Sequence, residues 1–259
     1  MADTGGVTAI DLNADLAEHD TLTHHDLSLL DHVTSASLAC GFHAGSAAVM
    51  RAAAAECTER GVAIGAHVSY RDRDGFGRRP LDVAAERLAD DIVEQWDALV
   101  AEAAVVGGTV SFVKPHGALY DRMATDPDVA AVVVGALVGR CAVLVAPPVG
   151  EVPGPALAAG IRVVPEGFCD RGYDVGGVLL PRDHTGSLVD DPDAVAERAR
   201  SLAVDGGMAT ADGSWVGLEV ETLCLHGDRP GADVRARAVR AALERAGVAV
   251  RSFIGAPAG

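Results

Sequence analysis

The chain has 259 residues, 49% of them hydrophobic and only 4% aromatic, which suffices for one large domain or at most two small ones. Its 21 basic and 37 acidic side chains give a formal net charge of −16, which repels nucleic-acid phosphates and anionic membrane surfaces. No basic cluster is longer than the pair Arg78-Arg79, so the sequence argues against both as partners.

Short β-rich runs alternate with helical patterns along the whole chain. Seven runs are predicted strands: residues 7–11, 36–39, 62–66, 110–113, 142–145, 161–164 and 221–225, with 248–253 as a candidate eighth. Four helices are predicted from their end signals: 47–60 between Ser46 and Gly61, 82–106 opened by Asp82, 192–204 after Asp191, and one from Pro230 or Gly231 to Ala246. There is no linker or composition break, so residues 1–259 are predicted to form a single domain around a parallel sheet.

Polar side chains follow six of the seven predicted strands, and only the fifth, which ends in Ala146-Pro147-Pro148, lacks one. An open doubly wound sheet gathers such groups at one switch point, from two or three strands. In a closed barrel the carboxyl ends of all strands face one mouth, so every strand can contribute. The distribution therefore favours an α/β fold, a TIM-barrel-like (β/α) barrel of seven or eight parallel strands.

Four of the nine histidines come just after predicted strands: His43, His67, His116 and His226. A lone histidine is more often structural than catalytic, but four at the same end of successive strands indicate a functional site. The other five lie in polar loops or on helix faces and are predicted to be solvated: His19, His24, His25, His32 and His184.

The first strand leads into an alternation of Asp11, Asn13 and Asp15, which the two-residue period of a strand points to one face. Asp15 and Glu18 are expected past the strand, in the loop. Two carboxylates at a barrel mouth can serve as a general base or as metal ligands, although Asp and Asn also cap helices and build turns.

Lys114 is the only lysine among the 21 basic residues, and Asn13 and Gln95 are the only residues of their types. Such a skew is typical of a genome rich in G and C, in which arginine replaces lysine wherever the chemistry allows. The one lysine that remains therefore points to a chemical requirement. Pro115 keeps Lys114 extended, at a strand end where a buried ammonium needs a carboxylate or an anionic substrate. The alternative is a surface lysine. Gln95 lies in the middle of a predicted helix, with no comparable claim.

Arginines after two of the strands offer guanidinium forks. Arg171, beside Asp170 and Tyr173, and the later Arg182 suit a carboxylate or a phosphate. Four more arginines follow the third strand and form either a lid or plain surface: Arg71, Arg73, Arg78 and Arg79.

Several common motifs are absent. The chain has no P-loop, no glycine-rich dinucleotide motif after a strand, no H-E-x-x-H and no G-x-S-x-G, which supports neither the usual nucleotide folds nor a serine hydrolase. Its five cysteines include no C-x-x-C pair, which argues against disulfides and a zinc ribbon and suits a reducing cytosol. With no signal-peptide pattern and no apolar run of ~20 residues, we expect a soluble, cytoplasmic protein.

These motifs together resemble the LamB/YcsF family, the A subunits of bacterial 5-oxoprolinase. The matching segments, in the family's order and over nearly the whole chain, are DLNADLAE (11–18), ACGFHAG (39–45), VAIGAHVSYRDRDGFGRR (62–79), VKPHGALY (113–120), CDRGYDVGG (169–177), LLPR (179–182) and CLHGD (224–228). One departure is Ala17, where the family usually has glycine. The extra methyl group is expected to tighten the loop that carries Glu18.

The resemblance implies a (β/α) barrel related to polysaccharide deacetylases, and ATP-dependent hydrolysis of the lactam 5-oxo-L-proline to L-glutamate. It also implies partner subunits B and C, and ATP with Mg that the partners bind or share. Lys114 and Arg171 are then assigned to the anions, Asp15 or Glu18 to base chemistry. The four strand-end histidines are assigned to proton transfer or orientation. Substrate binding is assigned to Asn13, Asp170, Arg171, Tyr173, Arg182 and Asp228.

Deacetylases with this kind of barrel bind a divalent metal through one Asp and two His. Asp15, His43 and His67 are the candidates here, but the usual H-x-x-x-H spacing is absent, which leaves metal dependence open. Two other interpretations stay open as well. One is a metal-dependent amidase or sugar deacetylase that acts alone, and the other is a non-catalytic subunit that presents 5-oxoproline to its partners.

Overall fold

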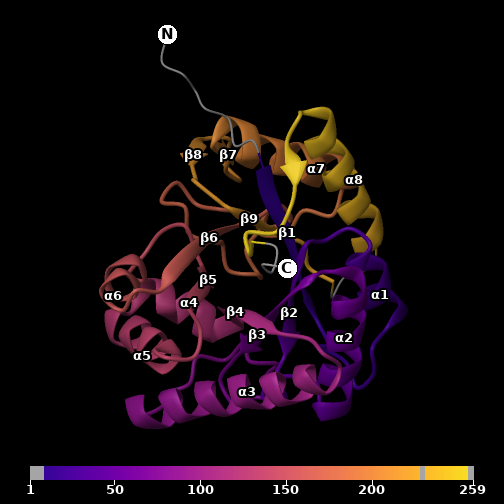
Figure 1. Ribbon diagram of the computed structural model, residues 1–259. Helices are drawn as coiled ribbons and strands as arrows, with labels where there is room; N and C mark the ends of the chain where they lie inside the picture. Colours follow the sequence, from indigo (N-terminus) through magenta and orange to yellow (C-terminus); the bar gives the residue numbers. More distant parts are fainter. Residues whose placement is uncertain (1–8, 228–230, 256–259) are drawn as a thin grey trace.

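The computed structural model describes residues 9–227 and 231–255, and a closed barrel of seven parallel strands lies at its centre (Figure 1). In barrel order the strands are β1 (Ala9–Leu16), β2 (Ser35–Ala39), β3 (Ala63–Val68), β4 (Val110–Pro115), β5 (Val143–Ala146), β6 (Arg162–Phe168) and β9 (Thr222–Cys224). The ring is closed because β9 pairs with β6 on one side and with β1 on the other. The predicted barrel of parallel strands is confirmed.

The eighth predicted run contributes only the short strand β10 (Ala249–Val250), which pairs in parallel with the start of β1 at Ala9 and Ile10. Pairing between β1 and β9 begins one residue later, at Asp11. For this reason β10 extends the wall of the barrel without entering the closed ring. Two further strands, β7 (Gly207–Ala209) and β8 (Trp215–Gly217), form a separate antiparallel pair.

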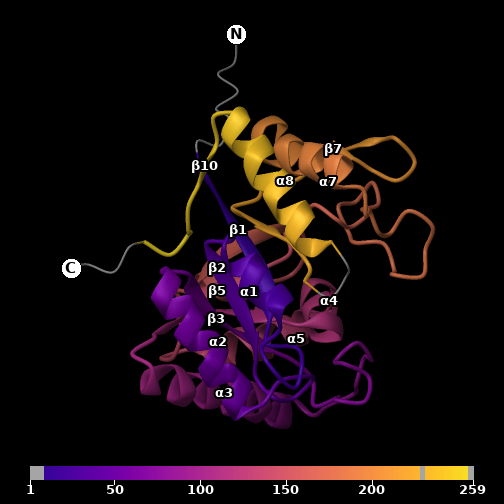
Figure 2. The same cartoon turned by 90° about the vertical axis from the view of Figure 1, so that its right-hand side faces the viewer.

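Helices cover the outside of the barrel (Figures 1 and 2). They are α1 (His24–Leu30), α2 (Ala47–Arg60), α3 (Ala85–Val105), α4 (Gly117–Thr125), α5 (Pro127–Leu137), α6 (Pro153–Ala158), α7 (Pro192–Arg200), which continues into a π-helix (Ser201–Asp205), and α8 (Ala232–Arg245). Along one flank α3 packs between α2 and α5, and on the opposite flank α7 packs against α8. No helix in the described part of the chain is both long and apolar enough to cross a membrane.

Capping explains where several helices begin and end. The Ser46 side chain accepts a hydrogen bond from a backbone N–H in the first turn of α2, and Gly61 ends that helix in the left-handed conformation (φ 68°), as predicted. Asp191 caps α7 in the same way. The prediction for α3 is wrong at its start, because Asp82 makes no cap and the helix begins at Ala85.

The helical patterns in the sequence do not indicate four of the helices, namely α1, α4, α5 and α6. All four are short, with 6 to 11 residues each, so each shows too few turns for a clear apolar period. A start signal for α5 is nonetheless present, because the Asp126 side chain caps the helix and Pro127 is its first residue.

Apolar side chains plug the barrel at the starts of its strands. Phe112, Val145 and Val164 are fully buried there, and Phe253 of the C-terminal segment packs edge-on against Phe112 with ring centroids 5.1 Å apart. A Cβ atom at Gly65 would lie 2.1 Å from the Phe112 ring, so this position requires glycine. The plug leaves the carboxyl ends of the strands as the open end of the barrel.

Candidate active site at the carboxyl ends of the strands

A cavity of about 580 Å³ lies at the carboxyl ends of the strands. Nine of the site residues predicted from the sequence line it: Asp15, Glu18, His67, Lys114, His116, Arg171, Tyr173, Arg182 and His226. Asn13, His43 and Asp170 lie behind this lining, and each contacts a residue that belongs to it. The remaining predicted residue, Asp228, lies outside the described residues.

β1 is longer than predicted and carries Asp15 into the barrel. Asp11, Asn13 and Asp15 all lie in β1 and are all buried, as expected for an alternation that points to one face. The expectation that Asp15 lies in the following loop is wrong, because β1 keeps its pairing with β2 as far as Leu16. Glu18 does lie in the loop.

Asp11 sits below the site, on the part of β1 nearest the plug. Its carboxylate accepts hydrogen bonds from the hydroxyl groups of Thr34, Ser35 and Thr222. Burial raises the pKa of Asp11 to about 6, although these hydrogen bonds act in the opposite direction. Asp11 therefore links β1 to its neighbours β2 and β9 through hydrogen bonds and does not line the cavity.

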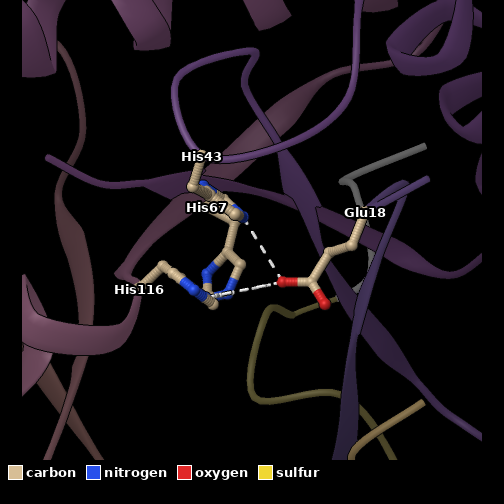
Figure 3. A group of neighbouring side chains, drawn as sticks. All are labelled: Glu18, His43, His67 and His116. Atoms are coloured by element: carbon tan, nitrogen blue, oxygen red, sulfur yellow. Dashed lines mark hydrogen bonds and ion pairs between the residues drawn. The ribbon is translucent and has the colours of Figure 1, made fainter. Parts of the chain in front are cut away.

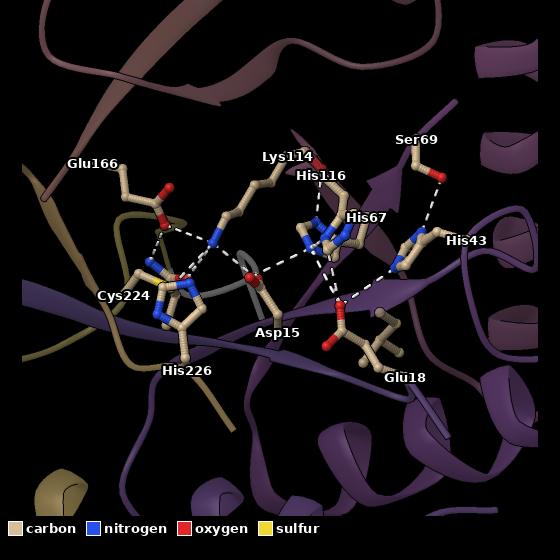
Figure 4. Close-up of polar contacts among 12 residues, drawn as sticks. Asp15, Glu18, His43, His67, Ser69, Lys114, His116, Glu166, Cys224 and His226 are labelled. Atoms are coloured by element: carbon tan, nitrogen blue, oxygen red, sulfur yellow. Dashed lines mark hydrogen bonds and ion pairs between the residues drawn. The ribbon is translucent and has the colours of Figure 1, made fainter. Parts of the chain in front are cut away.

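Lys114 is the centre of a buried polar group that we call the lysine cluster, formed by Lys114, Asn13, Asp15, Glu166 and Cys224. Figure 4 shows Lys114 among Asp15, Glu166 and Cys224. The Nζ atom lies 2.8 Å from both Asp15 Oδ1 and Glu166 Oε1. It lies 3.2 Å from Asn13 Oδ1 and 3.3 Å from Cys224 Sγ. With 2% of its surface exposed, Lys114 is not the surface lysine of the alternative interpretation.

The charges within the lysine cluster compensate one another. Burial by itself lowers the pKa of Lys114, but the adjacent Asp15 carboxylate raises that pKa well above its ordinary value. Burial raises the pKa of Asp15, yet His67 and Lys114 together hold it well below its usual range. Burial also raises the pKa of the Cys224 thiol well above its ordinary value. At neutral pH Lys114 is therefore an ammonium, Asp15 a carboxylate and Cys224 a protonated thiol, and Glu166 is a second acidic partner of the ammonium.

Two buried polar atoms of cavity-lining residues have no hydrogen-bond partner among the described residues, Glu166 Oε2 and the Tyr120 hydroxyl. The other Glu166 oxygen accepts from Asn13 at 2.9 Å and pairs with Lys114. Burial, followed by the nearby Glu166 charge, raises the pKa of Tyr120 well above its ordinary value, so the hydroxyl keeps its proton. Neither residue is in the predicted set. Glu166 does carry a signal in the sequence, because it follows the sixth predicted strand, whereas no pattern singles out Tyr120.

A second group, the histidine cluster, consists of Glu18, His43, His67 and His116 (Figure 3). Glu18 Oε1 lies 3.3 Å from His43 Nε2 and 3.5 Å from His116 Nδ1. It lies 3.9 Å from His67 Nε2, which is itself 2.9 Å from His116 Nδ1. The two clusters meet where His67 Nε2 is 3.4 Å from Asp15 Oδ2 (Figure 4). The donor set is compatible with a divalent metal.

Each imidazole of the histidine cluster makes a further hydrogen bond on its far side. His43 Nδ1 lies 2.9 Å from Ser69 Oγ. The other two rings bond to backbone carbonyl oxygens, at 3.0 Å for His67 and 2.9 Å for His116. Burial lowers the pKa of His43 and of His116 well below the ordinary value, so both rings are neutral.

Ser69 is held in turn by Gln95, the single glutamine of the chain. Gln95 Oε1 accepts the Ser69 N–H at 2.8 Å, and Gln95 Nε2 donates to the Ser69 carbonyl oxygen at 3.0 Å. Gln95 is fully buried in α3, which packs against β3. The sequence pattern gives no reason to connect this residue with the site, and the connection comes from helix packing.

Ala17 lies between the strand and Glu18 in a left-handed conformation, with φ 62°. This conformation costs a residue with a Cβ atom roughly 1 kcal/mol or more, whereas glycine adopts it readily. A Cβ atom at Gly45 would lie 2.8 Å from the Ala17 carbonyl oxygen, so the two segments are in close contact. Alanine at this position therefore strains the loop while Glu18 stays within the histidine cluster.

His226 is held at the opposite edge of the site by Asp170, whose two carboxylate oxygens each lie 2.9 Å from His226 Nδ1. With Asp15 and Cys224, His226 forms another group of potential metal ligands. Because the Lys114 ammonium already bonds to Asp15 and Cys224, this group contains its cation and would repel a second one.

Two guanidinium groups, Arg171 and Arg182, line the same cavity. Burial and then the neighbouring charge of Arg182 lower the pKa of Arg171, as expected where two cations lie close together. Such a pair suits a carboxylate or a phosphate group. Among the arginines after β3, Arg78 lines the cavity, whereas Arg71 and Arg79 are held by carboxylates outside it.

Comparison with known proteins identifies the family. Residues 10–257 match the LamB/YcsF family. This chain belongs to that family. A relative from Streptomyces griseus subsp. griseus, named as the A subunit of 5-oxoprolinase, is 49% identical over 94% of this chain and 99% of its own. A relative of the same name from Kocuria rhizophila is 44% identical over 95% of this chain and 100% of its own.

Solved structures agree with this assignment. The lactam utilization protein from Thermus thermophilus superposes with a TM-score of 0.88 at 39% identity, over 95% of this chain and 100% of its own. A family 4 carbohydrate esterase from Streptomyces lividans has a TM-score of 0.54 at 12% identity, over 96% and 94% of the two chains. The esterase shares the fold alone. The expected family and kind of barrel are confirmed.

Proposed function

We propose that this chain is the A subunit of an ATP-dependent 5-oxoprolinase, which hydrolyses the lactam of 5-oxo-L-proline to L-glutamate together with partner subunits. The observation that carries the proposal is the match, over nearly the full length of both chains, to relatives named as A subunits of 5-oxoprolinase. The cavity supports it, because a buried acceptor and a buried donor there lack partners among the described residues.

The chemistry explains why ATP is needed. A five-membered lactam is stabilised by resonance, and its hydrolysis is nearly balanced in free energy. Transfer of the γ-phosphoryl group of ATP to the amide oxygen releases ADP and makes the ring carbon electrophilic. Water adds to that carbon, the C–N bond breaks as the nitrogen takes up a proton, and a second water hydrolyses the resulting acyl phosphate. The site must therefore bind anions and supply a base.

Glu166 and Tyr120 are complementary to the lactam group. The lactam N–H is a donor and its C=O an acceptor, so Glu166 Oε2 accepts from the nitrogen and the Tyr120 hydroxyl donates to the oxygen. Both protein atoms are buried, and neither makes a well-formed hydrogen bond among the described residues, so the substrate supplies each with a partner. Lys114 holds Glu166 in place through their 2.8 Å ion pair.

The anionic groups are assigned to the cationic part of the cavity. Arg171 and Arg182 bind the substrate carboxylate or the transferred phosphoryl group. Lys114 is also proposed to meet an anion, but four acceptors already surround its Nζ, so its constant role is to orient Asp15 and Glu166. The rest of the proposed substrate-binding set is Asn13, Asp170, Tyr173 and Asp228.

Asp15 or Glu18 is the proposed base that takes a proton from water. The pKa of Asp15 lies well below its usual range, because His67 and Lys114 outweigh its burial, so the carboxylate form is present at neutral pH. Proton transfer and orientation are assigned to the four strand-end histidines: His43, His67, His116 and His226.

The proposed complex contains subunits B and C, and ATP with Mg that those subunits bind or share, because this chain lacks the common phosphate-binding motifs. The relatives' name, which specifies one lettered subunit, itself implies an assembly of several subunits. We place the protein in the cytoplasm, since its five cysteines are free and buried.

The test is glutamate release from 5-oxoproline by this chain alone, by subunits B and C, and by all three together, each with and without ATP. We expect release only by the three together with ATP. Release by B and C alone would make this chain a non-catalytic presenting subunit. The histidine cluster favours a second candidate, a metal-dependent amidase, and ATP-independent release by this chain that a chelator abolishes would support it.

Two variants test the lactam contacts in the reconstituted complex. Glu166→Gln and Tyr120→Phe are each expected to lower kcat/KM for 5-oxoproline about 10-fold or more, since each removes a hydrogen bond to the substrate. Tyr70→Phe is the matched control, because Tyr70 is equally buried but does not line the cavity. Equal losses in all three variants would contradict the assignment.

A further inference from the structure

His67 and His116 face each other, and backbone carbonyl groups fix the positions of their protons. His67 Nδ1 lies 3.0 Å from the Lys114 carbonyl oxygen, and His116 Nε2 lies 2.9 Å from the Phe76 carbonyl oxygen. A carbonyl oxygen can only accept, so these two nitrogens carry protons. The remaining nitrogens, His67 Nε2 and His116 Nδ1, face each other across 2.9 Å and are the nitrogens that the two rings can offer to a cation.

A serine fixes the tautomer of the third ring, His43. The Ser69 hydroxyl donates its single proton to the Tyr70 carbonyl oxygen at 3.0 Å. Toward His43 Nδ1, 2.9 Å away, the same hydroxyl is therefore an acceptor, and Nδ1 carries the proton. His43 Nε2 is left with a lone pair, 3.3 Å from Glu18 Oε1, which is itself an acceptor (Figure 3).

Three imidazole nitrogens and one carboxylate oxygen thus converge within 4.8 Å of one another. A proton can bridge only two such atoms, whereas a metal cation can bind all four at once. We propose that the histidine cluster binds one divalent transition-metal ion, with His43 Nε2, His67 Nε2, His116 Nδ1 and Glu18 Oε1 as its ligands.

The separations in the cluster fit a tetrahedral site. Ligand atoms about 2.0–2.1 Å from a zinc ion in tetrahedral geometry lie about 3.4 Å from one another. Glu18 Oε1 lies 3.3, 3.5 and 3.9 Å from the three nitrogens, and the two facing imidazole nitrogens are 2.9 Å apart. The His43 and His116 rings are stacked with their centroids 4.0 Å apart, so one of them must turn about its side-chain bonds to direct its nitrogen at the same ion.

The hydrogen bonds behind the rings are those of metal-bound imidazoles. A histidine ligand donates its second N–H to an oxygen, which fixes the orientation of the ring, and all three rings do so here. Three imidazole nitrogens and one carboxylate favour zinc, cobalt, nickel or copper over magnesium and calcium, which prefer sets made of oxygen alone.

Asp15 contacts this site only at its edge. Its Oδ1 bonds to Lys114 at 2.8 Å, and its Oδ2 is 3.4 Å from His67 Nε2. Glu18 and His116 complete the proposed ligand set in place of Asp15. The set expected from the resemblance is Asp15, His43 and His67. The proposal does not rest on 5-oxoprolinase activity, because it follows from the positions and hydrogen bonds of four side chains.

The test uses the full chain without an affinity tag, stripped with a chelator and titrated with zinc. Mass spectrometry measures metal content and calorimetry measures affinity. We expect one zinc ion per chain and, after loading with Co(II), visible absorption bands of a four-coordinate site. His43→Gln and His116→Gln are each expected to lower zinc affinity about 100-fold or more, since losing a ligand exceeds the 10- to 100-fold cost of losing an outer hydrogen bond.

His25→Gln is the matched control, because His25 is an exposed histidine on α1 and should leave zinc binding unchanged. Circular dichroism separates a folding defect from the loss of a ligand, and metal content of the wild-type chain is informative even if a variant misfolds. Wild-type chain that binds no zinc, or folded His43→Gln and His116→Gln variants that keep wild-type affinity, would overturn the proposal. None of these measurements needs ATP or partner subunits, so failure here is distinct from failure of the proposed function.

Discussion

The lysine cluster and the histidine cluster lie side by side at the barrel mouth, but their polar groups are satisfied in opposite ways (Figure 4). Around Lys114 an ammonium meets the carboxylates of Asp15 and Glu166, so opposite charges within the chain complement each other. Around Glu18 three imidazole nitrogens lie 3.3 to 3.9 Å from one carboxylate oxygen, and the single lysine of the chain is not among these groups. The lysine cluster therefore pairs its charges within the chain and leaves Glu166 Oε2 for a ligand, whereas the histidine cluster contributes through what it binds.

Removing the ammonium is expected to have the largest effect. Lys114→Met leaves the buried carboxylates of Asp15 and Glu166 without a counter-ion, which should lower the free energy of unfolding by about 3–5 kcal/mol. Urea unfolding measures this loss. ATP-dependent glutamate release by the complex should fall below detection, and full activity would contradict the role of Lys114.

A double variant separates charge from packing in the lysine cluster. Adding Glu166→Gln to Lys114→Met removes one of the two unpaired carboxylates, so part of the lost stability should return. If the double variant is as unstable as Lys114→Met, lost packing outweighs the unpaired charge.

Asp11, in the layer below the lysine cluster, is expected to make stability depend on pH. Burial raises its pKa from 3.8 to about 6, so between these values the folded chain binds a proton that the unfolded chain has released. The free energy of unfolding should therefore fall by up to about 3 kcal/mol as the pH rises from about 4 to about 6. Asp11→Asn should flatten this part of the profile. Denaturant unfolding at several pH values compares the two, and parallel profiles would contradict the assignment.

Zinc is expected to stabilise the protein through the histidine cluster alone. At a concentration of zinc about 100-fold above its Kd, binding to the folded state should add about 2.7 kcal/mol to the free energy of unfolding. His116→Gln should lose this gain, and Glu166→Gln in the neighbouring cluster should keep it. Urea unfolding with and without zinc makes the comparison. If Glu166→Gln loses the gain and His116→Gln keeps it, zinc does not bind at the histidine cluster.

The smallest effect is expected behind His43. Ser69→Ala removes the acceptor of the His43 Nδ1–H while all four proposed ligands remain, so zinc affinity should fall about 10-fold. Calorimetry measures the change. Ser111→Ala is the control, since Ser111 is a half-buried serine on β4 that bonds to a carbonyl oxygen away from the cluster. A similar loss in both variants would show that the effect is not specific.

Strand geometry made part of the site predictable. The alternation of Asp11, Asn13 and Asp15 predicts one shared face, because successive side chains of a strand point to opposite sides. The strand-end histidines are predicted to gather, because all parallel strands of a barrel end at one mouth. The end of β1 was not predictable in this way, since pairing with β2 carries the strand through Asp15 to Leu16.

Other members of the site depend on contacts between elements. Tyr120 lies in α4, a helix too short to show a clear apolar period in the sequence. It lines the cavity because α4 begins at Gly117, just after β4 ends at Pro115. Gln95 reaches Ser69 only because α3 packs on β3. Glu166 carried a positional signal after its strand, but its contacts with Asn13 and Lys114 follow from barrel closure.

By itself the sequence determined the kind of barrel and the groups at its mouth, because the alternation of strands and helices and the polar residues at strand ends are local patterns. Only the tertiary structure decided which of those groups meet. Lys114 lies between two carboxylates, and three histidines gather around Glu18. The physical reason is range: hydrogen bonds and ion pairs act over about 3 Å, and Asn13 and Glu166, bonded at 2.9 Å, are 153 residues apart in the chain.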